Sequence, residues 1–112
     1  MKIVAINGSP RKNGNTARCL EAAGREAEAA GVEFRVFQPG PDVRPCMACY
    51  HCLNTGSLRC VRNDDGVNEI IAACIEADGI LLASPVYHGG IAGGMKCVLD
   101  RLMLAAGCGD NQ

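Results

Sequence analysis

The chain has little net charge, no basic patch and no long apolar run. Its 112 residues include 11 lysines and arginines against 12 aspartates and glutamates, which gives a net charge of -1. Because nucleic-acid sites concentrate lysine and arginine on one surface, we expect no nucleic-acid partner. Hydrophobic residues make up 48% of the sequence, and this composition predicts one soluble globular domain over residues 1–112.

The sequence also has no recognisable targeting or membrane segment. Its first apolar run, Ile3 to Ile6, passes directly into Asn7 and Gly8, so it is too short for a secretion signal. It is also far below the roughly 20 residues of a membrane span. We therefore expect a cytoplasmic protein without a membrane partner. In that reducing compartment the eight cysteines indicate metal, redox or buried-thiol roles more strongly than disulfides.

The most informative stretch gathers four cysteines into fifteen residues. Thiolates two residues apart can converge on one soft metal centre, which scattered cysteines cannot do. The spacing alone leaves three alternatives open: a cubane iron–sulfur cluster, a structural zinc site and uncoordinated thiols. The neighbouring His51 is a substitute ligand that we expect to lie outside the coordination sphere. The four cysteines are Cys46, Cys49, Cys52 and Cys60.

Four further cysteines lie outside this stretch. Cys19, Cys74 and Cys97 fall within helical patterns, and we expect them to be small buried hydrophobic residues rather than ligands. Cys108 lies in the tail.

Glycine and proline divide the rest of the chain into alternating strands and helices. Residues 3–6 and 79–83 are short apolar runs typical of strands buried on both faces. Residues 32–37 alternate apolar and polar, which predicts a half-exposed edge strand. Residues 84–90 are expected to form a loop. Residues 42–65 contain the four clustered cysteines and show no clear periodicity. A connection of this length is unusual in a compact domain, and we expect a bound ligand to order it.

Three amphipathic helices are expected between these strands. The first begins at Thr16 and stops at Gly31, the second covers residues 67–75, and the third covers residues 95–102. The acidic pair Asp64–Asp65 is placed to cap the second helix and is not needed for catalysis.

Alternating strands and helices predict an α/β fold with a parallel sheet, right-handed crossovers and helices on both faces. Ligands of such sheets bind at the carboxyl ends of the strands. Residues 7–15 and 84–90 both follow strands directly, so we expect them to share one edge of the sheet. That arrangement predicts one shared site.

The loop of residues 7–16 has the groups that a phosphate needs. Its glycines let the backbone turn amides inward, its neutral side chains donate hydrogen bonds, and Arg11 or Lys12 adds charge at a helix start. Five residues rather than four separate its glycines, so it is not a nucleoside triphosphate loop, and the dinucleotide fingerprint is absent as well. The alternative interpretation is a solvated turn in which Asn15 caps the helix.

Together these motifs resemble those of a known family. The loop Gly8-Ser9-Pro10-Arg11-x-x-Gly14-Asn15-Thr16, the cysteine cluster, Ser84-Pro85-Val86-Tyr87, and Lys96 with Asp100–Arg101 are similar to motifs of the flavodoxin-like NADPH-dependent FMN reductases, and within them of the iron–sulfur flavoproteins. The resemblance covers residues 2–104. It implies a flavodoxin-like doubly wound parallel sheet, bound FMN and a homo-oligomer. It also implies electron transfer with NAD(P)H or a reduced carrier such as a ferredoxin-like protein.

The resemblance also implies roles for individual residues. No residue is expected to act as a catalytic acid, base or nucleophile, because the flavin carries the chemistry. For two ring residues the sequence leaves alternatives, a half-buried aromatic for Tyr87 and an exposed turn residue for His88. The implied ligands of the FMN phosphate are Ser9, Arg11, Asn15 and Thr16. The implied neighbours of the isoalloxazine ring are Pro85, Val86, Tyr87, His88 and Gly89. The implied ligands of a [4Fe–4S] cluster are Cys46, Cys49, Cys52 and Cys60.

The sequence departs from the family in length. A five-stranded sheet of this kind needs about 150 residues at roughly 30 residues per βα unit. We therefore expect a sheet truncated after the third βα unit, with an exposed edge and apolar surface that favour association. Within the last helix, Asp100–Arg101 is interpreted as a helix ion pair or a subunit contact.

Three functional classes follow. The favoured one is an FMN-dependent oxidoreductase, similar to the NAD(P)H-dependent FMN reductases, that moves electrons between a reduced donor, FMN and a [4Fe–4S] cluster. The second is a flavin-binding electron carrier without a cluster. The third is a structural fragment whose cysteines bind zinc or nothing.

Overall fold

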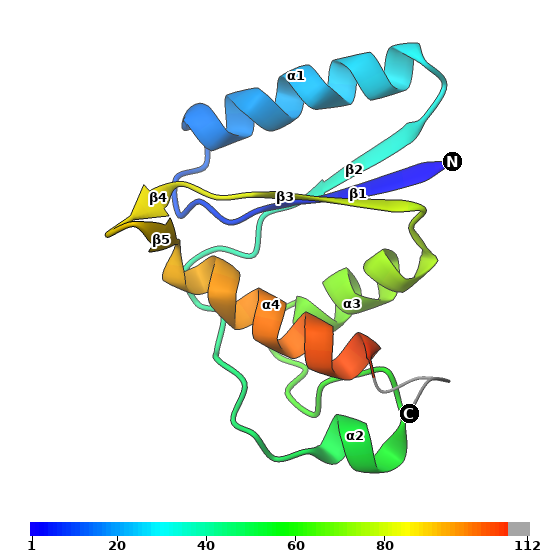
Figure 1. Cartoon of the computed structure of the whole chain (residues 1–112), viewed down its shortest axis with the longest axis vertical. Coiled ribbons are helices and arrows are strands. Elements are labelled where there is room, and N and C mark those ends of the chain that lie inside the picture. Colours follow the sequence, from blue (N-terminus) through cyan, green and yellow to red (C-terminus); the bar gives the residue numbers. More distant parts are fainter. Residues whose placement is uncertain (108–112) are drawn as a thin grey trace.

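A computed structural model describes residues 1–107 of the chain. Its centre is a three-stranded parallel sheet with helices on both faces (Figure 1). The strands are β1 (Lys2–Asn7), β2 (Glu33–Phe37) and β3 (Gly79–Ala83), in the order β2-β1-β3. This is the beginning of the flavodoxin-like strand order, so the predicted fold class is confirmed.

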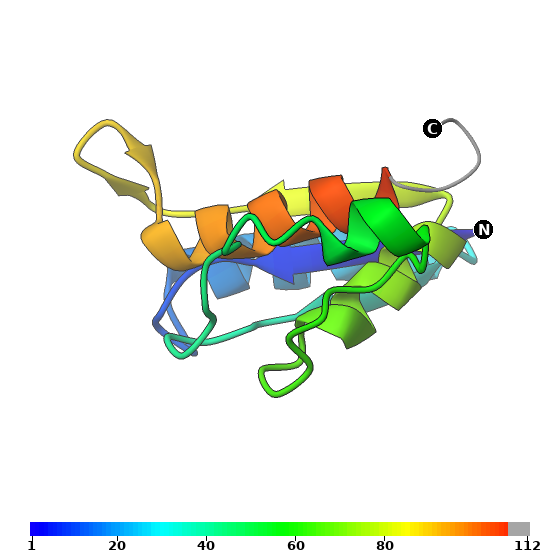
Figure 2. The ribbon, with the colours of Figure 1, turned by 90° about the horizontal axis from the view of Figure 1, so that it is seen from below.

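Helix α1 covers one face of the sheet, while α3 and α4 cover the other (Figure 1). The short helix α2 contacts α4 on the side that faces away from the sheet, as Figures 1 and 2 both show. None of the helices in the described residues has the length and apolarity needed to cross a membrane. The helices are α1 (Asn15–Ala29), α2 (His51–Thr55), α3 (Val67–Glu76) and α4 (Gly93–Ala106).

β1 lies at the centre of the sheet because its side chains are apolar on both faces. Val4 and Ile6 belong to the core that α3 and α4 complete, so alternation along the strand turns Ala5 toward α1. Close packing of α1 requires Gly24, where an added Cβ would lie 2.9 Å from a ring carbon of Phe34 in β2. Small residues on α1 and β1 thus bring the helix directly onto the sheet.

β3 differs from its prediction as a strand buried on both faces. Ile80, Leu81 and Leu82 are 47%, 38% and 42% exposed. The reason is that β3 forms one edge of the sheet, and within residues 1–107 no strand pairs with its outer side. β2 forms the other edge, as predicted. The exposed apolar side of β3 is the kind of surface that soluble proteins usually cover, and association through it stays a prediction.

Two segments predicted to be irregular contain regular structure. Residues 84–90 were expected to form a loop, but β4 (Val86–Tyr87) and β5 (Gly90–Ile91) pair as an antiparallel hairpin. The hairpin turns at His88 and Gly89, both with positive φ (51° and 76°), the geometry of a tight two-residue turn. It stands away from the body in both views (Figures 1 and 2). The second segment is the cysteine loop, which contains α2. The hairpin strands and α2 are too short for an apolar repeat to be recognised in the sequence.

The apolar period predicts that the inner faces of the second and third expected helices consist of Val67, Ile70, Ile71, Cys74 and Ile75, and of Met95, Val98, Leu99 and Leu102. All of them are buried except Leu99, which is partly buried against the core, and Ile75. Val67, Ile70 and Ile71 of α3 are buried, but Ile75 is 45% exposed. The buried residues of α4 are Met95, Val98, Arg101, Leu102 and Ala105.

Two isoleucines of α3 provide a matched test of this core. Replacing the fully buried Ile71 with alanine is expected to lower the free energy of unfolding by about 2–5 kcal/mol, because the change leaves a cavity. The same change at the half-exposed Ile75 is expected to stay within about 0.5 kcal/mol. Urea denaturation of both variants gives the comparison. An equal loss for Ile75→Ala would mean that the inner face of α3 is misassigned.

Candidate functional site

The phosphate loop and the hairpin border one cleft of about 400 Å³ at the carboxyl ends of the strands. The structure thus brings together the two loops that were expected to share an edge. The volume is in the range of small-ligand sites. The lining residues that the sequence singled out are Ser9, Arg11, Asn15, Thr16, Pro85 and Tyr87, and the remaining ones are Asn13, Gly14 and Arg18.

Hydrogen bonds within the phosphate loop fix its shape. The Ser9 amide donates to Oδ1 of Asn7 at 2.9 Å, and the Arg11 amide donates to Oγ of Ser9 at 3.1 Å. Ser9 itself is buried, at 5% exposure. Gly8 is required by packing, because an added Cβ would lie 2.7 Å from Cβ of Met95 in α4. The loop therefore holds its conformation through contacts with its own residues and with α4.

Gln38 is a residue of this loop's surroundings that sequence reasoning missed. Its side-chain Nε2 donates to the carbonyl oxygens of Ser9 at 2.9 Å and Arg11 at 2.8 Å. By holding both carbonyls, Gln38 keeps these acceptors from facing an anion in the cleft. The sequence did contain a signal for Gln38, because this residue directly follows β2. Since β2 pairs with β1 up to Phe37, Gln38 lies at the same edge of the sheet as the phosphate loop.

The cleft opens at the N-terminus of α1, which is a favourable place for an anion. Gly14 is the N-cap and Asn15 is the first helical residue, so the alternative in which Asn15 caps the helix is wrong. The first amides of a helix lack intrahelical acceptors and point at such a site. Arg11 and Arg18 line the cleft and add positive charge. Arg18 was missed, although it lies three residues after Asn15 and so on the same side of the helix.

Only some of the five predicted neighbours of the flavin ring line the cleft. Pro85 and Tyr87 line the cleft, whereas Val86, His88 and Gly89 do not. Val86 is 75% exposed, and His88 and Gly89 form the turn of the hairpin. Contact of these three residues with a flavin ring stays a prediction.

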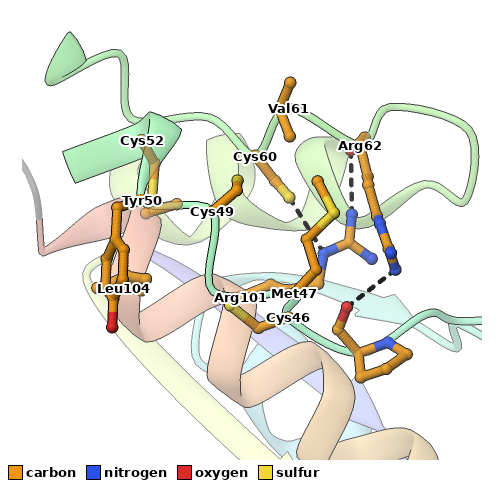
Figure 3. Close-up of a pocket in the computed structure, with 12 residues that line it drawn as sticks. Cys46, Met47, Cys49, Tyr50, Cys52, Cys60, Val61, Arg62, Arg101 and Leu104 are labelled. Atoms are coloured by element: carbon orange, nitrogen blue, oxygen red, sulfur yellow. Dashed lines mark hydrogen bonds between the residues drawn. The ribbon is translucent and has the colours of Figure 1, made fainter. Parts of the chain in front are cut away.

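The four predicted cysteine ligands line a second pocket, formed by the cysteine loop and α4 (Figure 3). Its cavity volume is about 20 Å³, room for roughly one water molecule. Within residues 1–107, no three Cys, His, Asp or Glu side chains are arranged to hold a metal ion. The structure thus gathers Cys46, Cys49, Cys52 and Cys60 in one place without closing them around a centre. His51 does not line the pocket.

The cysteine pocket is separate from the cleft. The two sites have no lining residue in common. α4 begins beside the hairpin, and its later residues Arg101, Leu104 and Ala105 line the cysteine pocket. From Gly93 to Arg101 the helix rises by about 12 Å. α4 therefore runs from one site to the other.

The backbone of the cysteine loop contains left-handed residues other than glycine. Ala48, Tyr50 and Leu58 have φ of 55°, 60° and 60°, a conformation that costs roughly 1–2 kcal/mol for a residue with a Cβ. Ala48 and Tyr50 alternate with Cys49, whose φ is not positive. Such alternation turns successive amides toward a concave surface, which is found in many anion and iron–sulfur sites.

Arg101 holds this loop in place. Each of the five N–H groups of its guanidinium has an acceptor: the two oxygens of Asp65, the carbonyls of Arg44 and Arg62, and Sγ of Cys60 at 3.3 Å. The side chains of Arg101 and Asp65 are only 1% and 6% exposed. Arg101 and Asp65 thus hold the loop from inside, while a ligand bound to residues 42–65 stays a prediction.

The interpretation of Asp100–Arg101 as a helix ion pair is therefore wrong. Arg101 pairs with Asp65, and Asp100 pairs with Lys96. Adjacent residues on a helix do not face each other. Arg101 shares the buried face of α4 with Val98, whereas Asp100 is exposed.

Cys60 has a second anchor on α3. The Cys60 amide donates to Oδ1 of Asn68 at 2.7 Å, and Nδ2 of Asn68 donates to the Cys60 carbonyl at 2.9 Å. Asn68 is buried, at 5% exposure. The backbone of Cys60 is thus fixed by α3 and its sulfur by α4.

The remaining cysteines follow their prediction only in part. Cys74 is buried, and burial raises the pKa of its thiol. Cys97 is half-buried, and Cys19 is exposed, which contradicts its prediction as a buried residue. Cys19 lies on the outer side of α1, next to the buried Leu20. Cys108 lies outside the described residues.

Comparison with known proteins identifies the family. The family model of the NADPH-dependent FMN reductases matches residues 1–111. The chain belongs to this family. It is 38% identical over 102 residues to an iron–sulfur flavoprotein of Methanocaldococcus jannaschii, a match that covers 90% of this chain and 51% of the relative.

Two further relatives give the same result. Iron–sulfur flavoproteins of Archaeoglobus fulgidus and Methanosarcina thermophila are 39% and 40% identical over 104 and 105 residues. These matches cover 92% and 93% of this chain but 46% and 53% of the relatives. The chain thus spans about half the length of the curated relatives that it matches.

The cleft fits the phosphate of the cofactor after which the FMN reductase family is named. It combines a helix N-terminus, hydroxyl and amide side chains, and the guanidinium groups of Arg11 and Arg18. These are the groups that bind a dianion well. For the cysteine pocket the donor set fits a soft metal centre, since it consists of four thiols.

The hydrogen bonds between Asp65 and Arg101 shift the pKa values of the two side chains in opposite directions. Burial by itself raises the pKa of Asp65, but hydrogen bonds from Arg101 and from the Arg44 amide outweigh burial and hold the pKa below its ordinary value of 3.8. Burial also disfavours the charged form of Arg101, yet its hydrogen bonds to Asp65 and Cys60 raise its pKa. The pair is therefore ionised at neutral pH.

Replacing Asp65 with asparagine tests this ion pair. At neutral pH the variant is expected to be about 3 kcal/mol less stable, because it leaves a buried guanidinium without its counter-charge. The folded-state pKa is lowered, so the stabilisation is complete well above pH 3.8 and is lost as the pH falls through 3.8 to the folded-state value. The measurement is the difference in free energy of unfolding between wild type and variant from pH 7 downward. A difference that does not shrink in acid would contradict the assignment.

Proposed function

We propose that this chain is the FMN-binding part of an oxidoreductase that moves electrons between a reduced nicotinamide, FMN and a [4Fe–4S] cluster. The observation that carries the proposal is the cleft in which a phosphate loop at the start of α1 meets Pro85 and Tyr87. Membership of the NADPH-dependent FMN reductase family supports the same activity.

In this proposal the phosphate loop binds the FMN phosphate. Ser9, Asn15 and Thr16 donate from hydroxyl and amide groups, and Arg11 supplies positive charge. Pro85 and Tyr87 border the isoalloxazine ring, with Val86, His88 and Gly89 on the hairpin beside it. FMN, when bound, accepts a hydride and releases electrons singly. The protein orients the flavin, and no side chain needs to act as acid, base or nucleophile.

The proposed cluster ligands are Cys46, Cys49, Cys52 and Cys60. Support comes from their shared pocket, from the left-handed residues between them, and from relatives that are named iron–sulfur flavoproteins. One observation favours a second candidate, a flavin-binding electron carrier without a cluster. The cavity volume is only about 20 Å³, so the thiols would have to move to surround a cubane.

The proposal includes a homo-oligomer in the cytoplasm. Association would cover the apolar side chains of β3 and the groove beside them, which is lined in part by Leu82, Ile91 and Met103. The electron partner is a nicotinamide or a ferredoxin-like protein. A reducing compartment agrees with the free thiols of Cys46, Cys49 and Cys60.

Replacing Thr16 with valine tests the phosphate site. The change removes one hydroxyl donor and is expected to weaken FMN binding by about 1–3 kcal/mol, the range for a hydrogen bond to a charged group. Riboflavin, which lacks the phosphate, should bind the wild type much more weakly than FMN and should be insensitive to Thr16→Val. Flavin fluorescence titration measures both ligands. Equal affinities of FMN and riboflavin for the wild type would rule out a phosphate site here.

Replacing Cys60 with alanine tests the cluster. After anaerobic reconstitution the variant is expected to lose its iron and to keep its FMN, because the cleft and the cysteine pocket have no lining residue in common. Cys19→Ala is the matched control, since Cys19 is exposed on α1. Iron and flavin are measured on the same samples. Iron at the wild-type level in Cys60→Ala would exclude Cys60 as a ligand, and no iron in the wild type would leave the carrier without a cluster.

A further inference from the structure

The charged side chains that line the cysteine pocket are arginines. Arg62 and Arg101 are the charged residues in its lining, and no aspartate or glutamate of residues 1–107 belongs to that lining. Arg62 donates to the Pro45 carbonyl at 3.0 Å, and its side chain lies at the pocket in Figure 3. A pocket that gathers four cysteines thus has arginines in its lining.

Arg101 is oriented so that one edge of its guanidinium faces the thiols. Its two terminal nitrogens donate to Asp65, while Nε donates to Sγ of Cys60 at 3.3 Å (Figure 3). The counter-charge of Asp65 therefore lies on the side away from Cys60. Asp65 does not line the pocket, whereas Arg101 does.

We propose that Arg101 is a positioning residue of the cysteine site that raises its reduction potential. The inference rests on the proposed function and goes beyond it by assigning a role to a residue that is no ligand. Arg101 donates an N–H···S hydrogen bond to Cys60 and places a positive charge at the pocket. Hydrogen bonds to cluster sulfurs and nearby charge are the terms by which a protein sets the potential of such a centre.

The direction follows from the charge balance of the electron transfer. One electron, supplied by reduced flavin or by another one-electron donor, adds one negative charge to the cysteine site without making or breaking a bond. Arg101 stays protonated in both states. Because its side chain is 1% exposed, solvent screens its attraction for that added charge only weakly. The reduced state gains more than the oxidised state, and the potential rises.

Asn68 separates the electrostatic role from a purely mechanical one. It holds the backbone of Cys60 with two hydrogen bonds and carries no charge. The position of Cys60 therefore does not depend on Arg101 alone. What Arg101 adds, and Asn68 does not, is a positive charge.

The test is an anaerobic potentiometric titration of the reconstituted holoprotein with iron content measured on each sample. Arg101→Gln is expected to have a lower midpoint potential than the wild type, and Arg101→Lys to lie between the two. Asp65→Asn, which removes the negative charge but keeps Arg101, is expected to shift the potential upward. Lys96→Gln is the matched control, because Lys96 is a cation of the same helix that is exposed and pairs with Asp100. It should leave the potential unchanged.

Opposite shifts for Arg101→Gln and Asp65→Asn support the proposal, because loss of a merely structural anchor would move both variants in the same direction or neither. An unchanged potential in an iron-loaded Arg101→Gln overturns it. If Arg101→Gln does not fold or hold iron, the comparison of Arg101→Lys with Asp65→Asn decides, and shifts of equal sign overturn it. A wild type that takes up no iron overturns the proposed cluster itself and this role with it.

Discussion

A buried guanidinium must find acceptors for all of its N–H groups, and this requirement organises the least regular part of the molecule. Arg101 gains five acceptors from the segment between Arg44 and Asp65. That segment has only the five residues of α2 as regular structure. Breaking such a pair costs about 3–5 kcal/mol, a large fraction of the stability of a small domain. The position of the cysteines therefore depends on a charge in α4.

α4 connects the two sites and serves each in a different way. Its beginning packs Met95 against Gly8 and so supports the phosphate loop, while its later turns carry Arg101 to the cysteine pocket. Between them Val98 and Leu102 are buried in the core with α3. A change in the core face of α4 would therefore disturb both the cleft and the pocket.

The sequence predicts those parts that depend on local pattern. β3 begins and ends at the predicted residues, Gly79 and Ala83, because a short apolar run between polar segments has few other structures open to it. Arg101 could not be predicted as a buried cation, since its acceptors are mostly backbone carbonyls and a carboxylate far along the chain. The position of Gln38 directly after β2 was a signal, but its acceptors are the backbone carbonyls of Ser9 and Arg11, which no side-chain motif reveals. The exposure of β3 depends on which strands lie beside it, and a strand's own residues cannot reveal that.

We propose that one chain holds both a flavin and an iron–sulfur centre. The most direct measurement is the visible absorption spectrum of freshly purified, anaerobic protein, with FMN and iron determined on the same sample. We expect flavin bands over broad iron–sulfur absorption, with about one FMN and about four iron atoms per chain. A sample that binds FMN but shows no iron–sulfur absorption after anaerobic reconstitution would contradict the account.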